Sequence, residues 1–66
     1  MNDTFERIQE AMNTLEETYK LPLYFVYVEE MSYEEVALHL AISQEAVRQR
    51  LSRGLKKLQE KLSHLR

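Results

Sequence analysis

The basic side chains of this 66-residue chain gather in its last third, where they can contact phosphate groups. Residues 43–66 hold seven basic and two acidic side chains, a balance of +5, whereas residues 1–42 hold two basic and nine acidic ones, a balance of −7. Because salt screens charges over roughly 10 Å, local clustering matters more than net charge. A basic segment on an acidic body can therefore bind a polyanion such as nucleic acid.

The segment Ser32–Leu58, SYEEVALHLAISQEAVRQRLSRGLKKL, has the pattern of a helix-turn-helix. Ser32 and Glu35 form a capping box at the start of its first helix. Ser43 is expected to cap the second helix, with Glu45 in its first turn, where the helix dipole favours a carboxylate. The turn between them is very short, so the two helices must cross at a steep angle.

The second helix of this motif, expected to run from Ser43 to about Leu62, has one apolar and one polar face. Its apolar stripe spans about 80° of arc at the helical period and is expected to face the core: Val47, Leu51, Leu55, Leu58, Leu62 and Leu65. The other side carries Glu45, Gln49, Arg53 and Lys56, flanked by Arg48, Arg50 and Ser52. Arg and Gln can read base edges through paired hydrogen bonds, and Lys and Arg also hold phosphates.

Composition predicts a single all-α domain over residues 1–66, with the helix-turn-helix at 32–62 and no cofactor. The chain has no cysteine, one glycine and one proline, so neither disulfides nor hairpins supply its order. We find no apolar run of the ~20 residues that a membrane span needs and no signal peptide, and we expect a cytoplasmic location. His39 and His64 lack the spacing of metal ligands, and paired glutamates without a nucleophile do not indicate an enzyme.

The first half of the chain is predicted to form two more helices. Asp3 can cap the first one, whose apolar stripe holds Phe5, Ile8, Met12, Leu15 and Tyr19. We expect a break within residues 16–20. The run LPLYFVYV at Leu21–Val28 has strand-forming residues, but no second strand is available, so we expect a buried helix with Pro22 in its first turn. Its aromatic residues Tyr24, Phe25 and Tyr27 are expected to fill the core rather than to stack on bases.

Over residues 12–60 the chain resembles region 4 of a bacterial sigma factor of the extracytoplasmic-function type. The matching residues include the string SYEEVA at Ser32–Ala37 and many positions on both sides of it: Leu15, Glu17, Tyr19, Lys20, Phe25, Tyr27, Glu29, Leu40, Ile42, Ser43, Val47, Arg48, Arg50, Leu51, Arg53, Lys56, Lys57 and Leu58. The resemblance implies a four-helix domain, like a winged-helix DNA-binding bundle without the wing. It also implies that the domain recognises the promoter −35 element and docks on the flap of the RNA polymerase β subunit.

The resemblance assigns roles to individual residues. Four match positions that face bases in the major groove: Arg48, Gln49, Ser52 and Arg53. Seven match or neighbour positions suited to phosphates: Ser32, Tyr33, Ser43, Gln44, Arg50, Lys56 and Lys57. The chain also departs from the family pattern, with Glu16 in place of a common proline, Glu30 and Ala41 in place of glycines, and Gln44-Glu45-Ala46 in place of a small neutral stretch.

Other interpretations of the same pattern stay open. The basic face can be an ordinary solvated helix surface. The leucines near the C-terminus can pack on the first helix or bind a partner helix, as in a homodimer or a complex with polymerase or an anti-sigma factor. Two further functions are a stand-alone dimeric helix-turn-helix regulator, and a protein-interaction domain that binds polymerase or an anti-sigma factor without touching DNA. Glu45 favours the last.

Overall fold

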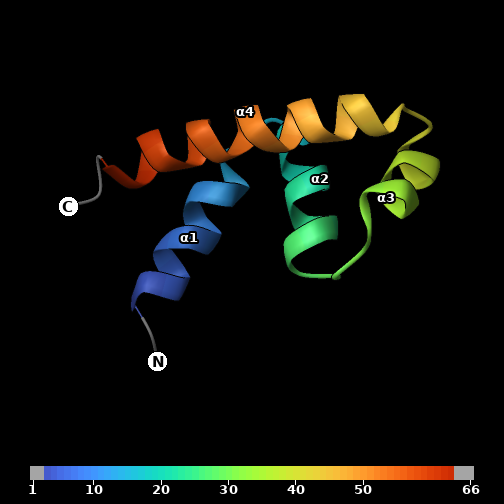
Figure 1. Ribbon diagram of the computed structural model, residues 1–66. Helices are drawn as coiled ribbons and strands as arrows, with labels where there is room; N and C mark the ends of the chain where they lie inside the picture. The colour runs from blue at the N-terminus through green and yellow to red at the C-terminus, as the bar shows by residue number, and fades with distance from the viewer. Residues whose placement is uncertain (1–2, 64–66) are drawn as a thin grey trace.

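The computed structural model describes residues 3–63, with all side chains in that range except those of Asp3 and Phe5. Across this range it contains four helices and no strand: α1 (Asp3–Asn13), α2 (Glu17–Tyr27), α3 (Tyr33–Leu40) and α4 (Gln44–Ser63). The predicted all-α fold is therefore confirmed. Figure 1 shows α4 as one long helix, with α1, α2 and α3 arranged along one side of it from its C-terminal to its N-terminal end.

The core lies where α2 and α3 meet the first half of α4. Val36 and Val47 have no exposed surface, and Leu23 and Leu51 are almost as deeply buried. These residues form one apolar cluster, completed by Leu15 and Ala37. Helix α4 contacts each of the other helices, and α2 also contacts α3. Burial of one face of α4 therefore determines which of its residues remain on the outside.

Gly54 marks a close approach between α2 and α4. A Cβ atom added at this residue would lie 3.1 Å from Leu23 Cδ1 and 3.3 Å from Tyr19 Cβ, which is tighter than ordinary packing. Gly54 is buried, whereas the neighbouring Leu55 is 39% exposed. The expected stripe of α4 was therefore wrong at Leu55: the inward face includes Gly54, whose lack of a side chain lets α4 lie close to α2.

Helix α2 begins earlier than the sequence indicated. The break between the first two helices lies at residues 14–16, and the polar residues 17–20 belong to α2. Pro22 is therefore inside the helix and not in its first turn, so the expected start near Leu21 was wrong. Glu16 precedes α2 without a side-chain capping bond, which left no capping signal in the sequence.

The prediction that the aromatic residues of α2 fill the core holds for only one of the three. Phe25 packs against the core and lies edge-on to the His39 ring, with 5.0 Å between ring centroids. Tyr24 and Tyr27 are exposed. Helix α2 buries Pro22 and Leu23 instead, so its outer surface carries these two tyrosines.

Two turns place residues other than glycine in the left-handed region of the backbone. Glu30, before α3, has a φ of 57°, and Ala41, after α3, has a φ of 58°. At the second turn the Ile42 amide donates to the Ala37 carbonyl at 3.0 Å, which satisfies an end carbonyl of α3. Both residues stand where the resemblance expects glycine, and the structure gives the reason: the turns require positive φ.

Candidate nucleic-acid interface

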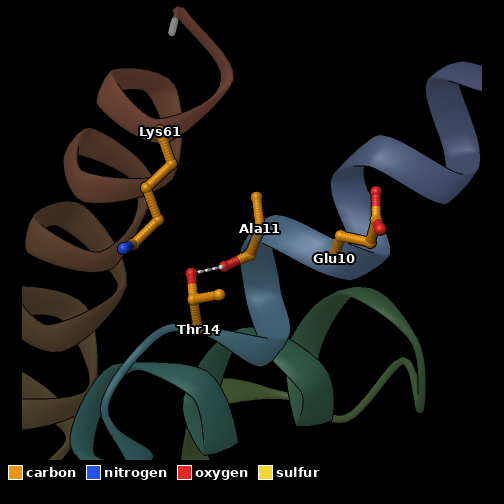
Figure 2. Close-up of a pocket in the computed structure, with 4 residues that line it drawn as sticks. All are labelled: Glu10, Ala11, Thr14 and Lys61. Carbon is orange, nitrogen blue, oxygen red and sulfur yellow. Dashed lines mark hydrogen bonds between the residues drawn. The ribbon is translucent and has the colours of Figure 1, made fainter. Parts of the chain in front are cut away.

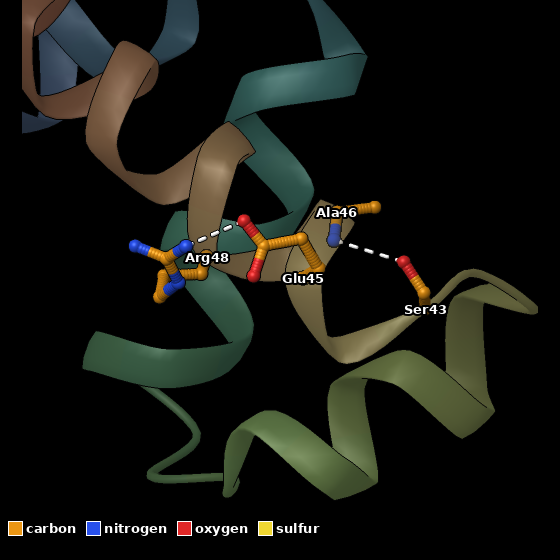
Figure 3. Close-up of polar contacts among 4 residues, drawn as sticks. All are labelled: Ser43, Glu45, Ala46 and Arg48. Carbon is orange, nitrogen blue, oxygen red and sulfur yellow. Dashed lines mark hydrogen bonds and ion pairs between the residues drawn. The ribbon is translucent and has the colours of Figure 1, made fainter.

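The start of each helix in the motif is held by a serine, as the sequence predicts. The Ser32 hydroxyl accepts a hydrogen bond from the Glu35 amide at 3.1 Å, and the Glu35 carboxylate accepts one from the Ser32 amide at 2.8 Å. At α4, the Ser43 hydroxyl accepts from the Ala46 amide at 3.0 Å (Figure 3). These bonds satisfy amides that a helix start would otherwise leave unpaired. They fix the residues at which α3 and α4 begin.

The outer face of α4 displays the residues predicted to read bases. Arg48, Gln49, Ser52 and Arg53 are all exposed, and the buried Val47 and Leu51 lie on the opposite side of the helix. Of the residues predicted to contact phosphates, Gln44, Lys56 and Lys57 are exposed on α4, and Arg50 is half-buried. One helix therefore presents a continuous polar surface over about two turns, supported from behind by the core.

Ser32, Tyr33 and Ser43 lie at the starts of α3 and α4, and all three are exposed. The hydroxyls of Ser32 and Ser43 act as caps, so these side chains are already engaged with the backbone. The Tyr33 hydroxyl is the least committed of the three. Tyr33 lies one residue after the Ser32 cap, in the first turn of α3.

Glu45 forms an ion pair with Arg48 across the first turn of α4 (Figure 3). Arg48 Nη2 donates a hydrogen bond to Glu45 Oε2. This bond, together with the charge of Arg48, lowers the pKa of the Glu45 carboxyl. The i, i+3 spacing of Glu45 and Arg48 is visible in the sequence and indicates such a pair. Glu45 was predicted to favour the helix dipole and a protein-interaction role, and its pairing with Arg48 was not predicted.

Lys57, which is predicted to contact a phosphate, lies beside an aromatic ring of α2. Its Nζ lies over the Tyr19 ring of α2, 5.4 Å from the ring centroid, in a cation–π contact. The side chain therefore bridges α4 and α2. Tyr19 was missed because this contact joins residues that are far apart in the sequence.

A cleft of about 250 Å³ lies at the other end of the molecule, between α1 and α4, lined by Glu10, Ala11, Thr14 and Lys61 (Figure 2). The Thr14 hydroxyl donates a hydrogen bond of 2.8 Å to the Ala11 carbonyl oxygen at the end of α1. None of the predicted site residues lies there. Among residues 3–63 the structure brings together no group of three or more side chains of the kind that hold a metal ion.

Some predictions concern the ends of the chain. The Asp3 cap, the Phe5 contribution to the first apolar stripe, His64 and Leu65 lie outside the described side chains. Within the described range, Leu58 packs against the core and Leu62 is half-buried. No helix among residues 3–63 is both long and apolar enough to cross a membrane.

Comparison with protein families gives one match. The sequence pattern of the family described as Sigma-70, region 4, matches residues 5–58, which include α2, α3 and most of α4. Comparison with individual curated proteins gives no match. The matched range covers the capped helix-turn-helix and the exposed polar face of α4.

Proposed function

The chain belongs to the sigma-70 region 4 family, and from that premise we propose that it recognises the −35 element of promoters through α4. Members of this family are DNA-binding modules through which sigma factors recognise promoters, and the family is not a catalytic one. The finer proposal is that α4 enters the major groove of the −35 element. We also propose that the module is of the extracytoplasmic-function type and acts in the cytoplasm.

One observation supports this proposal above the others. The exposed polar face of α4 is opposite its buried face, and Val47 and Leu51 anchor that buried face in the core. A recognition helix must be held rigidly at a fixed angle if its side chains are to reach base edges. In this proposal Arg48, Gln49, Ser52 and Arg53 contact bases.

The remaining polar residues are proposed to hold the DNA backbone. Ser32, Tyr33, Ser43 and Gln44 lie near helix N-termini, where amides and hydroxyls can approach phosphates. Arg50, Lys56 and Lys57 supply positive charge along α4. Because Lys57 is held over the Tyr19 ring, we expect it to contribute least of the three.

Docking on RNA polymerase is the second part of the proposal. Tyr24, Tyr27 and Val28 are exposed apolar residues at the C-terminal end of α2, and none of them belongs to the polar face of α4. Apolar side chains grouped on a surface commonly mark a protein interface. We propose that the flap of the β subunit binds there, leaving α4 free for DNA.

Arginine replacement tests DNA recognition. Arg53→Ala removes an exposed guanidinium from the proposed base-reading face, and we expect promoter affinity to fall by about 1–3 kcal/mol. Lys61→Ala serves as a charge-matched control, because Lys61 lines the cleft beside α1. Fluorescence anisotropy with a labelled promoter duplex measures both variants. Equal loss in the two variants, or none in Arg53→Ala, contradicts the base-reading role.

A protein-interaction domain is the second candidate, favoured by the Glu45–Arg48 pair. In this pair, the predicted base-reading side chain of Arg48 is bound to a carboxylate, and the carboxylate repels phosphate. In that case the acidic first half and the apolar surface of α2 bind polymerase or an anti-sigma factor. Retention of polymerase by the immobilised chain, with no shift of any duplex at low salt, would favour this candidate. A homodimer through the second half of α4 stays a prediction, for which the exposed Leu55 is available.

A further inference from the structure

Glu45 is the only carboxylate that the described part of the chain places among the proposed base-reading side chains of α4. It forms an ion pair with Arg48 and accepts a hydrogen bond from Arg48 Nη2 at Oε2. A single acidic group thus holds one of the four proposed base readers. Glu45 also lies in the first turn of α4, directly after the short connection from α3.

Stability alone does not account for this arrangement. The side chains of Glu45 and Arg48 are 58% and 64% exposed, and exposed ion pairs contribute little to folding. The helix dipole favours an acidic residue in the first turn, but it does not require one that faces the base-reading side chains. A carboxylate at this place also weakens the attraction of α4 for phosphates.

The chemistry of the pair suggests a role in selectivity. A guanidinium has five N–H donors in a rigid plane, so Arg48 keeps donors free while one nitrogen is bound to Glu45. Fixing that plane prepares Arg48 for the two acceptors that guanine presents in the major groove. The carboxylate itself can only accept hydrogen bonds, so it is repelled by acceptor-rich base edges and by phosphates.

We propose that Glu45 is a specificity-determining positioning residue, which orients Arg48 toward guanine and lowers affinity for DNA in general. This inference depends on the proposed function, because it assumes that α4 enters the major groove. Glu45 thus exchanges overall affinity for discrimination between sequences.

The test compares selective with non-selective binding. A duplex preferred by the wild-type chain is first selected from a random-sequence pool. A series of altered duplexes, in each of which a different single guanine is replaced, serves for comparison. Glu45→Ala is expected to bind random duplex roughly 3- to 10-fold more tightly at low salt, because a negative charge is removed. The ratio of affinities for the preferred and altered duplexes should fall by a similar factor at one guanine.

Two further variants separate selectivity from charge and from stability. Glu60→Ala removes the same charge from α4 roughly 22 Å along the helix, and it should leave the selectivity ratio unchanged. In an Arg48→Ala background, Glu45→Ala should no longer change that ratio, because the residue acts through Arg48. Thermal unfolding monitored by circular dichroism shows whether each variant keeps its fold.

The outcomes distinguish this inference from the proposed function. If the wild type selects no duplex from the pool, the proposed function fails and the inference fails with it. If the wild type is selective and Glu45→Ala keeps the same ratio while folded, only the inference is overturned. An effect of Glu45→Ala that persists without Arg48 also overturns it, since the carboxylate would then contact DNA directly.

Discussion

The two halves of α4 are built differently. The first half, residues 44–54, is capped by Ser43 and buries Val47, Leu51 and Gly54. The second half, residues 55–63, contains no fully buried residue: Leu58 and Leu62 are half-buried and Leu55 is exposed. In Figure 1 the first half lies across α2 and α3, whereas the second half extends beside α1.

This difference indicates a division of labour along one helix. The proposed base-reading residues 48–53 all lie on the half that three features fix in place: the cap, the short turn and the core. The second half contacts α1, the Tyr19 ring of α2 through Lys57, and the edge of the core through Leu58, but none of its residues is fully buried. Stability and recognition should therefore both depend on the first half, while the second half should tolerate change.

Truncation of a leucine in each half tests the comparison most strongly. Leu51→Ala should lower the free energy of unfolding by about 2–5 kcal/mol, because Leu51 is 2% exposed and the core cannot fill the cavity. Leu62→Ala should cost less than about 1 kcal/mol, because solvent already reaches this side chain. Urea unfolding followed by circular dichroism measures both.

Similar losses of unfolding free energy from the two substitutions would contradict the difference between the two halves of α4. For a domain of this size the total stability is only about 3–10 kcal/mol, so Leu51→Ala can unfold the chain completely. Leu51→Met keeps the volume and is expected to remain folded, with a loss below about 1.5 kcal/mol. It thus allows the position to be measured even if the alanine variant is unfolded.

The sequence alone predicted the first half of α4 better than its surroundings. Ser32 with Glu35, and Ser43 ahead of an apolar period, are short-range signals, and both caps are present in the structure. The exposed position of the basic face follows from the same period. Local capping chemistry and helical spacing were therefore sufficient for the helix-turn-helix.

Features that depend on long-range packing could not be predicted in this way. Periodicity placed Leu55 inward, because a glycine has no side chain to reveal that α2 approaches at Gly54. The unbroken apolar run of α2 has no period, so the exposure of Tyr24 and Tyr27 was hidden. The Lys57–Tyr19 contact likewise depends on how α2 and α4 cross.

Glycine substitutions of opposite expected effect offer a finer test of the two halves. Ala41→Gly, in the turn that sets the start of α4, should raise stability by up to about 1 kcal/mol, because alanine at a φ of 58° is strained. Gln59→Gly, in the exposed second half, should lower stability by about 1 kcal/mol through lost helix propensity. Thermal unfolding reports both shifts.

A loss of stability in Ala41→Gly would show that flexibility of the unfolded chain outweighs relief of the turn. Glu30→Gly provides an independent measure, because Glu30 has nearly the same φ in the turn before α3. If both turns gain stability, the departures from glycine at these positions are a cost that the fold carries. Part of that loss of stability then arises at Ala41, directly before the first half of α4.

Acidification is expected to have the smallest effect and to act on the start of the motif. The Ser32 amide and hydroxyl lower the pKa of Glu35 below 4.5, and Arg48 lowers the pKa of Glu45 below 4.5. A carboxylate whose pKa is lowered in the folded state stabilises the fold at pH values above its unfolded pKa. This stabilisation is lost as the pH falls through the folded pKa. Stability should therefore be constant near neutral pH and decline below about pH 4.5.

The variants Glu35→Gln and Glu45→Gln separate the two contributions. Each should flatten part of the decline, since a neutral amide cannot titrate, and Glu35→Gln should flatten more because its carboxylate accepts from the Ser32 backbone. Thermal unfolding at a series of pH values provides the measurement. A double variant that keeps the wild-type decline would place the acid sensitivity elsewhere in the chain, and the first half of α4 would then owe its rigidity to packing rather than to these carboxylates.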